Sequence, residues 1–220
     1  MPIVVHHLEA SRSTRVVWLL EELGVPYEIK RYLRNKATLL APPELEQIHP
    51  LGKSPVITDG EVTVAESGAI LEYLVEQYGK PGQLVPASGT PSYRHYRYFM
   101  HYAEGSLMPY LLMKLVFARV KTAPMPFFVK PIARKIADGV SEKFVTPNLM
   151  RHLKFLGDHL AKHAFIAGDA LTVADIQMSY PIISAVDRAA DLGIPASIVA
   201  YADKLKAQPG YQRAVAKAGA

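Results

Sequence analysis

The sequence predicts an α/β domain followed by an all-helical domain. Short apolar runs separated by Gly and Pro, a pattern typical of strands, occur only in the first third of the chain. The segment from 79 to 91 is rich in turn-forming residues and is typical of a linker. After it, apolar residues recur at three- and four-residue spacing, as on one face of a helix. We therefore expect an α/β domain at residues 1–79, a linker at 80–91 and a helical domain at 92–220.

The start of the α/β domain predicts two parallel strands joined by a helix. Residues 3–5 form a short apolar run, and a polar loop leads from them into a helical pattern over 16–23 that ends at Gly24. Residues 27–29 alternate as a second strand, and residues 33–49, with two prolines, are irregular or weakly helical. Strand, helix and strand of this brevity favour a parallel pair with a crossover. Together with the elements described next, this order is thioredoxin-like.

Residues 50–73 predict a hairpin, a helix start and a ligand site. The apolar runs 56–57 and 62–64 flank Asp59 and Gly60, a dipeptide that adopts positive φ and favours a tight turn. Apolar residues at 70, 71, 74 and 75 predict a helix that begins near Ser67. A helix start attracts carboxylates, and the Ser67 hydroxyl adds a donor, while Glu66 could hold an ammonium group. The corner therefore suits the free amino-acid end of a ligand, and Lys53 could neutralise a second carboxylate.

The helical domain is predicted from its apolar spacing and from one helix cap. Residues 93–117 predict a long helix that is interrupted at Pro109, and three prolines between 124 and 131 predict an irregular connection. Leucines at 149, 153, 156 and 160 lie on one helix face. Thr172 and Asp175 have the spacing of a capping box, and the helix they begin is apolar nearly all round and therefore buried. Two shorter helices, near 197–207 and 210–218, complete the bundle.

The composition excludes several kinds of chemistry. The chain has 220 residues, a formal net charge of +5 and no cysteine, which rules out disulfides, cysteine zinc sites and catalysis by a protein thiol. No apolar run reaches the length of about 18 residues that spans a bilayer, so a cytoplasmic location is expected, with no membrane partner. The basic residues are scattered, which favours small anions over nucleic acid. No metal is expected, since His6 and His7 are adjacent in a strand and point to opposite faces.

Two motifs carry a resemblance to a known family. The stretch 50–73 and the Gly-Asp-x-Leu-Thr-x-Ala-Asp element ending at 175 resemble the cytosolic glutathione S-transferases. The resemblance implies a cis bond before Pro55, pairing of the Ser54 backbone with the cysteinyl part of glutathione, and binding of its γ-glutamyl end by Glu66 and Ser67. It also implies a homodimer, and glutathione as cosubstrate without a prosthetic group. The chain departs from the family at Ser54, where an apolar residue is usual, and at His49, where Asn is frequent.

The loop before the first helix offers the catalytic hydroxyls. Glutathione transfer needs a thiolate, whereas such a thiol titrates near pH 8.5, so a shift of about two units, or about 2.7 kcal/mol, is required. A hydroxyl donor and a helix N-terminus could supply most of it. Ser11, Ser13 and Thr14 are the candidates. The spacing of Ser11 from Arg15 is similar to that of the serine-type, theta-like members, and the alternative is that Ser11 and Ser13 only cap the helix.

The expected function is conjugation of glutathione to hydrophobic electrophiles. The electrophile should lie against the helical domain, and the candidate pocket residues are Tyr110, Met113, Lys114 and Phe117, drawn from a longer aromatic and Met-rich stripe that includes Tyr102 and Met108. One alternative is a glutathione-dependent peroxidase or disulfide reductase that uses a second glutathione. Another is a stress-related or regulatory protein that binds glutathione without turnover.

Overall fold

The computed structural model describes residues 2–218 and begins with a four-stranded sheet. The strands are β1 (Ile3–Leu8), β2 (Tyr27–Tyr32), β3 (Val56–Asp59) and β4 (Val62–Ala65), in the order β2-β1-β3-β4. β1 and β2 are parallel and are joined through α1 (Thr14–Leu23), as expected, while β3 runs antiparallel to both β1 and β4. This arrangement is the thioredoxin-like sheet that the element order predicts.

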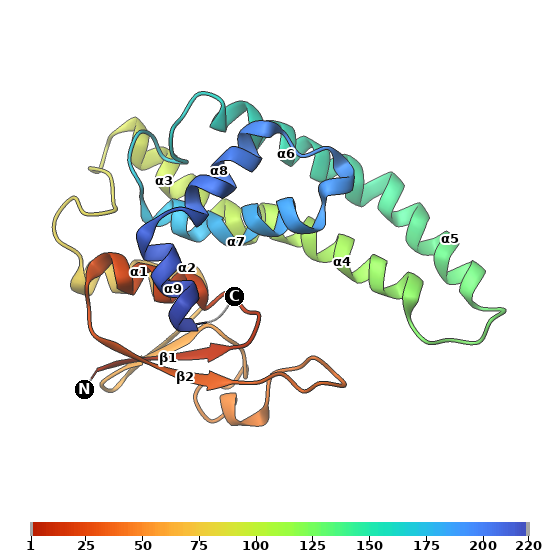
Figure 1. Cartoon of the computed structure of the whole chain (residues 1–220), viewed down its shortest axis with the longest axis horizontal. Coiled ribbons are helices and arrows are strands. Elements are labelled where there is room, and N and C mark those ends of the chain that lie inside the picture. Colours follow the sequence, from red (N-terminus) through yellow and green to blue (C-terminus); the bar gives the residue numbers. More distant parts are fainter. Residues whose placement is uncertain (1, 219–220) are drawn as a thin grey trace.

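Both faces of the sheet are covered. The helices α1 and α2 (Ser67–Tyr78) pack against each other and against the sheet (Figure 1). The helix α7 (Val173–Arg188), from the helical part of the chain, contacts both of them. Trp18 of α1 is fully buried there. The opposite face carries a smaller apolar cluster of Leu8, Tyr32, Leu45 and Val56, which lies beneath the short 3₁₀ helix η1 (Pro43–Leu45). Residues 33–49 are therefore mostly irregular, as predicted.

The hairpin and the helix start in 50–73 are confirmed. Asp59 pairs with Val62, so the loop residues are Gly60 and Glu61, and Gly60 has a φ of 59°. The peptide bond between Ser54 and Pro55 is cis, as the family resemblance implies. Helix α2 begins at Ser67. These features place the end of the Ser54 segment and the start of α2 on the same part of the domain.

The second part of the chain is all helical. It contains α3 (Pro91–Tyr102), a π-helical turn η2 (Ala103–Leu107), α4 (Met108–Thr122), α5 (Lys130–Val140), a second π-helical turn η3 (Ser141–Val145) and α6 (Thr146–Leu160). The expected interruption near Pro109 is the π turn η2, and Pro109 itself lies in the first turn of α4. The sequence analysis did not predict α5, because Pro131 indicated a break in the helix. Pro131 lies in the first turn of α5, where a backbone N–H has no partner within the helix, so its absence costs no hydrogen bond.

The last three helices include the buried central helix of the helical part, α7. They are α7 (Val173–Arg188), α8 (Ala196–Lys206) and α9 (Pro209–Ala218), with a 3₁₀ turn η4 (Ala190–Leu192) between the first two. α7 begins with the predicted capping box of Thr172 and Asp175 and is mostly buried. α9 returns to pack on α1, while α4 and α5 extend away from the sheet as a hairpin (Figure 1). Within residues 2–218, no helix is long and apolar enough to cross a membrane.

Candidate active site

Two serines of the loop after β1 form a hydrogen-bonded chain with a histidine. The Oγ atoms of Ser11 and Ser13 are 2.6 Å apart, and Ser13 Oγ is 2.8 Å from Nδ1 of His7. Ser13 is fully buried and Ser11 is 8% exposed. Ser13 occupies the N-cap position of α1, yet its side chain makes no capping hydrogen bond, so the simple capping interpretation is wrong for this residue. Burial, assisted by the nearby Arg31, lowers the pKa of His7, so the imidazole is neutral at pH 7.

Ser54 holds its segment beside Ser11. Its hydroxyl donates to the carbonyl oxygen of His6 at 2.9 Å and accepts the N–H of Leu8 at 3.3 Å. The Oγ atoms of Ser54 and Ser11 are 3.4 Å apart. A serine at a position where the family usually has an apolar residue therefore crosslinks the cis-proline segment to the end of β1. The neighbouring candidates are more accessible: Lys53 is exposed and His49 is partly buried.

The start of α2 presents Glu66 and Ser67. Glu66 is exposed and has a φ of 73°, whereas Ser67 is 3% exposed. The Oγ of Ser67 accepts a hydrogen bond of 3.0 Å from Nη2 of Arg15. That contact uses a lone pair, so the hydroxyl proton of Ser67 is free to donate to a ligand. Arg15 thus reaches from α1 to the helix start that should bind a carboxylate.

Arg15 is the centre of a buried network that the sequence did not predict in full. Its Nη1 donates to the backbone oxygen and the Oε1 of Gln177 at 2.6 and 3.0 Å, and its Nη2 donates to Glu104 at 2.6 Å. Arg12 donates from Nε to both carboxylate oxygens of Glu104 at 3.1 Å. Burial lowers the pKa of Arg15 and the Glu104 carboxylate opposes that shift, so the guanidinium stays charged. These contacts fasten α1 to α7 through Gln177 and to the start of α2 through Ser67.

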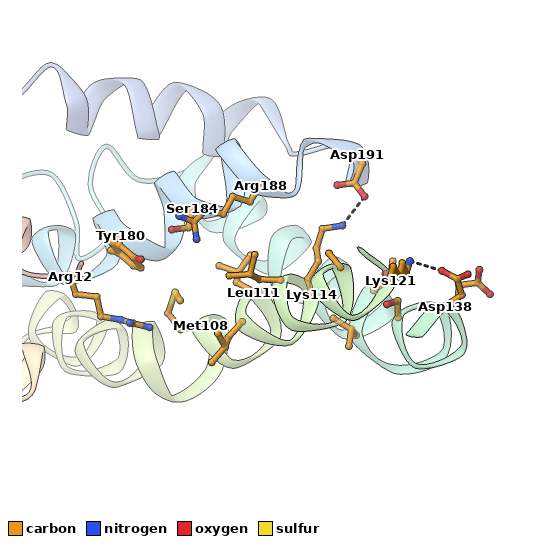
Figure 2. A pocket seen from close by; sticks show the side chains of 17 residues that line it. Arg12, Met108, Leu111, Lys114, Lys121, Asp138, Tyr180, Ser184, Arg188 and Asp191 are labelled. Atoms are coloured by element: carbon orange, nitrogen blue, oxygen red, sulfur yellow. Dashed lines mark hydrogen bonds and ion pairs between the residues drawn. The ribbon is translucent and has the colours of Figure 1, made fainter. Parts of the chain in front are cut away.

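A cavity of about 460 Å³ lies between α4, η3 and α7. One end is marked by Arg12, Met108 and Tyr180, and the Arg12 guanidinium lies 5.1 Å from the centre of the Tyr180 ring (Figure 2). At the other end the charged side chains are paired, Lys114 with Asp191 at 2.7 Å and Lys121 with Asp138 at 2.5 Å. Apolar side chains of α4 line the floor of the cavity from one end to the other: Met108, Leu111, Leu112, Leu115 and Ala118.

Only one of the four predicted pocket residues borders this cavity. Lys114 lines it, whereas Tyr110, Met113 and Phe117 do not. The Tyr110 ring instead packs against His152 and Phe144, with ring centres 5.1 and 6.0 Å apart. α4 is rotated so that Met108 and Leu111, rather than the aromatic residues, face the cavity.

A second cavity, of about 340 Å³, adjoins the serine chain. Its lining includes Ser11 of the loop, Thr14 and Arg15 of α1, and side chains of α7, α9 and the end of α8. It shares Tyr180, Ser184 and Arg188 with the first cavity, so these residues of α7 separate the two. A thiol placed beside Ser11 would therefore lie close to the end of the first cavity at Tyr180. The sequence analysis did not assign His7, Glu104, Gln177 or Tyr180 to the site, because their partners lie in other elements of the chain.

Comparison with known proteins finds relatives that cover most of the chain. Residues 3–76 match the model of the glutathione S-transferase N-terminal domain. Glutathione S-transferase 3 of Schizosaccharomyces pombe is 42% identical over 183 residues, which cover 83% of this chain and 74% of that protein. The chain belongs to the glutathione S-transferase family. The family and the two-part fold expected from the sequence are thereby confirmed.

Solved members of the glutathione S-transferase family share the whole fold. The glutathione S-transferase from Actinobacillus pleuropneumoniae is 29% identical with a TM-score of 0.79, and the match covers 98% of this chain and 92% of that one. A glutathione transferase family member from Pseudomonas fluorescens, solved with two glutathione bound, is 25% identical with a TM-score of 0.74 and coverage of 97% and 92%. The helical part of this chain thus belongs to the shared fold as much as the sheet does.

Proposed function

We propose that this chain conjugates glutathione, as its thiolate, to hydrophobic electrophiles, and that Ser11 stabilises the thiolate. The chain of hydrogen bonds from His7 through Ser13 to Ser11 carries this proposal. Ser11 is the member of that chain that borders the cavity, whereas Ser13 is fully buried. Ser13 therefore acts through Ser11 as a positioning residue.

The direction of the hydrogen bonds decides whether Ser11 can donate. Each hydroxyl has one proton, and neutral His7 carries one ring proton. With that proton on Nδ1, His7 donates to Ser13 and Ser13 donates to Ser11. The Ser11 proton has only the long 3.4 Å contact with Ser54 Oγ as an acceptor, and it would turn from there to a sulfur anion in the cavity. The backbone N–H of Ser13 also donates to Ser11 Oγ at 3.3 Å. Both contacts polarise the Ser11 hydroxyl and strengthen its bond to an anion.

The expected energies are sufficient for a thiolate at neutral pH. Lowering a thiol pKa from about 8.5 by two units requires about 2.7 kcal/mol. A hydrogen bond to a charged group contributes about 1.5–3 kcal/mol, and a helix N-terminus about 0.3–1 kcal/mol. Ser11 and the start of α1 together match the requirement.

Glutathione would lie across the start of α2 and the cis-proline segment. We assign the γ-glutamyl end to Glu66 and Ser67, the cysteinyl backbone to Ser54 beside Pro55, and the glycyl carboxylate to the exposed Lys53 near His49. The electrophile would occupy the 460 Å³ cavity, whose apolar floor suits a hydrophobic body. Tyr180 and Arg12 stand at the end of that cavity nearest the sulfur.

The test is the ultraviolet absorbance of the glutathione thiolate, followed from acid to alkaline pH on the protein complex. Because the chain has no cysteine, the thiolate band belongs to the ligand. We expect a midpoint about two pH units below that of free glutathione. Ser11→Ala should raise the midpoint by at least one unit, and His7→Leu by less. Ser88→Ala, an exposed serine of the segment between α2 and α3, is the control and should leave it unchanged.

The outcomes separate the candidate roles. A low midpoint that survives Ser11→Ala would transfer the role to Ser13 or to backbone amides. Tight glutathione binding with a midpoint equal to that of free glutathione would refute the transferase mechanism and favour a protein that binds without turnover.

A second candidate is a glutathione-dependent peroxidase or disulfide reductase. The Pseudomonas fluorescens relative with two glutathione bound favours it, since a second thiol is the resolving group that a chain without cysteine needs. The two adjoining cavities are the places where two such molecules would meet. Turnover of a hydroperoxide or of a glutathione mixed disulfide that exceeds conjugation of any aromatic electrophile would favour this alternative.

We also propose the domain division at 1–79 and 92–220 and assembly as a homodimer. The division is supported by the segment between Tyr78 and Pro91, which contains neither helix nor strand. Limited proteolysis should cut first within 80–91, and sedimentation should give twice the chain mass of 24.3 kDa. A stable monomer at micromolar concentration would contradict the dimer, which rests on the family resemblance.

A further inference from the structure

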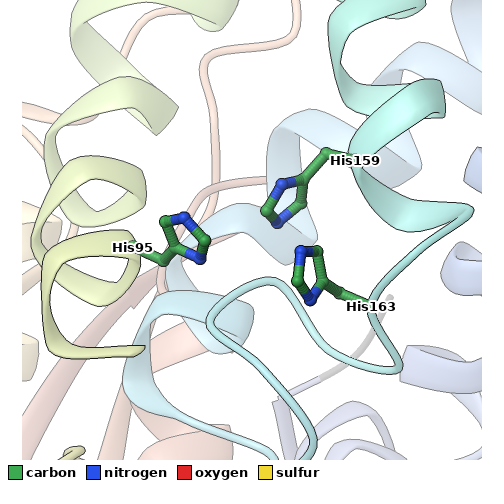
Figure 3. A group of neighbouring side chains, drawn as sticks. All are labelled: His95, His159 and His163. Atoms are coloured by element: carbon green, nitrogen blue, oxygen red, sulfur yellow. The ribbon is translucent and has the colours of Figure 1, made fainter. Parts of the chain in front are cut away.

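Three histidines from separate segments converge on the helical domain, away from the serine chain. His95 lies on α3, His159 near the end of α6, and His163 in the loop that follows α6 (Figure 3). One ring nitrogen from each residue lies within 4.8 Å of the corresponding nitrogens of the other two. The ring centres of His159 and His163 are 4.5 Å apart, and those of His95 lie 5.2 and 5.6 Å from them. All three side chains are partly buried.

A hydrogen bond to the backbone fixes the orientation of the His159 ring. His159 Nε2 is 2.8 Å from the carbonyl oxygen of Ile166, which can only accept, so Nε2 carries the ring proton and Nδ1 carries the lone pair. A hydrogen bond from the second ring nitrogen to a carbonyl is a common way of orienting a metal-ligating histidine. The His159 ring also packs on Phe99, with ring centres 4.9 Å apart.

We propose that His95, His159 and His163 bind one divalent transition-metal ion, of the class that prefers imidazole ligands. Zn²⁺, Cu²⁺ and Ni²⁺ belong to that class, and three histidines with a water molecule complete a tetrahedral zinc site. Zn–N bonds of about 2.0–2.1 Å place the nitrogens about 3.4 Å apart. The nitrogens must therefore approach one another by up to about 1.4 Å from the 4.8 Å limit, which rotation of the partly exposed side chains of His95 and His163 allows.

The position of the site predicts a structural effect. The three ligands join α3 to the end of α6 and to the loop that leads toward the capping box of α7. The link continues through Ile166, whose N–H donates to the buried Asp175 at 2.7 Å. Bound metal would fasten these segments together, and none of the three histidines lines either active-site cavity. Metal binding should therefore raise thermal stability and leave the pKa of bound glutathione unchanged.

The experiment is a Zn²⁺ titration of full-length protein that has been dialysed against a chelator. Calorimetry, or competition with a chromophoric chelator, should give one Zn²⁺ per chain. The variants His95→Gln and His163→Gln should each weaken binding at least tenfold, and a Zn²⁺ concentration that saturates the wild type should raise the Tm of the wild type by more than that of either variant. His101→Gln is the matched control, because His101 is an exposed histidine on the same helix as His95. It should bind Zn²⁺ as the wild type does.

The results can overturn the proposal in two ways. Absence of saturable Zn²⁺ binding by the folded wild type up to 100-fold molar excess would refute it. Equal affinity in the wild type, His95→Gln and His163→Gln would show that Zn²⁺ binds elsewhere. Circular dichroism of the metal-free variants establishes that they fold, and Co²⁺ gives a second readout, since a tetrahedral three-histidine site produces intense visible bands that His163→Gln should lack.

Discussion

Neutralising Glu104 tests the buried network that holds Arg15. Arg15 is 2% exposed and Glu104 is 32% exposed, and their closest atoms are 2.6 Å apart. Removing one partner of a fully buried ion pair costs about 3–5 kcal/mol. Glu104→Gln should cost less, because the amide oxygen still accepts, Arg15 keeps its bonds to Gln177 and Ser67, and water already screens part of Glu104. We expect a loss of about 2 kcal/mol.

The assay is urea and thermal unfolding at pH 7. A loss of about 2 kcal/mol corresponds to a fall in Tm of about 4–8 °C for a chain of this length. Glu104→Ala, which removes the acceptor as well as the charge, should lose more than Glu104→Gln. Asp158→Asn is the matched control: it breaks the Lys154–Asp158 pair, whose side chains are 76% and 62% exposed, and should change stability by less than about 0.5 kcal/mol.

The order of the three variants is decisive. A free energy of unfolding for Glu104→Gln within 0.5 kcal/mol of wild type would refute the idea that Glu104 compensates the buried guanidinium. The same would follow if Asp158→Asn cost as much as Glu104→Gln.

Three further predictions concern other contacts. Asp175→Ala should destabilise the protein by about 4 kcal/mol in urea unfolding, since the buried carboxylate accepts four hydrogen bonds and its removal strands their donors; a loss below 1 kcal/mol would contradict this. Burial opposes ionisation of Glu21, but hydrogen bonds from Lys217, Tyr27 and Arg213 outweigh it and lower its pKa to about 2. The stabilisation from ionised Glu21 is present above about pH 4.5 and is lost as the pH falls from about 4.5 to 2. Over this range the free energy of unfolding of Glu21→Gln should therefore fall by about 1–2 kcal/mol less than that of the wild type, a value discounted because both cations are half exposed. An unchanged acid profile would contradict this prediction. Ser67→Ala should raise the calorimetric Kd for glutathione at least tenfold, and an unchanged Kd would remove Ser67 from the site.

The elements that the sequence predicted correctly depend on neighbours in the chain. The Asp59-Gly60 turn, the helix start at Ser67 and the capping box of Thr172 and Asp175 each involve residues within a few positions of one another. Their geometry follows from backbone preferences and side-chain donors that are close in sequence. The family resemblance added the cis bond at Pro55, which spacing alone does not encode.

The sequence could not show how a helix is rotated against its neighbours. Tyr110, Met113 and Phe117 of α4 are predicted pocket residues that do not line the 460 Å³ cavity, and the Tyr110 ring packs against His152 of α6. The helix α5 was missed because the tolerance of Pro131 depends on its being in the first turn. Both depend on where a helix begins and which neighbour it packs against.

The sequence by itself determined the two-part fold, the absence of thiol chemistry in the protein and the residues that begin each local motif. The tertiary structure decided which polar groups share an environment: the chain from His7 to Ser11, the carboxylate of Glu104 beside two arginines, and the group of His95, His159 and His163. The physical reason is the range of the interactions. A turn or a cap is settled within about four residues, whereas these groups meet only because helices far apart in the sequence bury their apolar faces against one another.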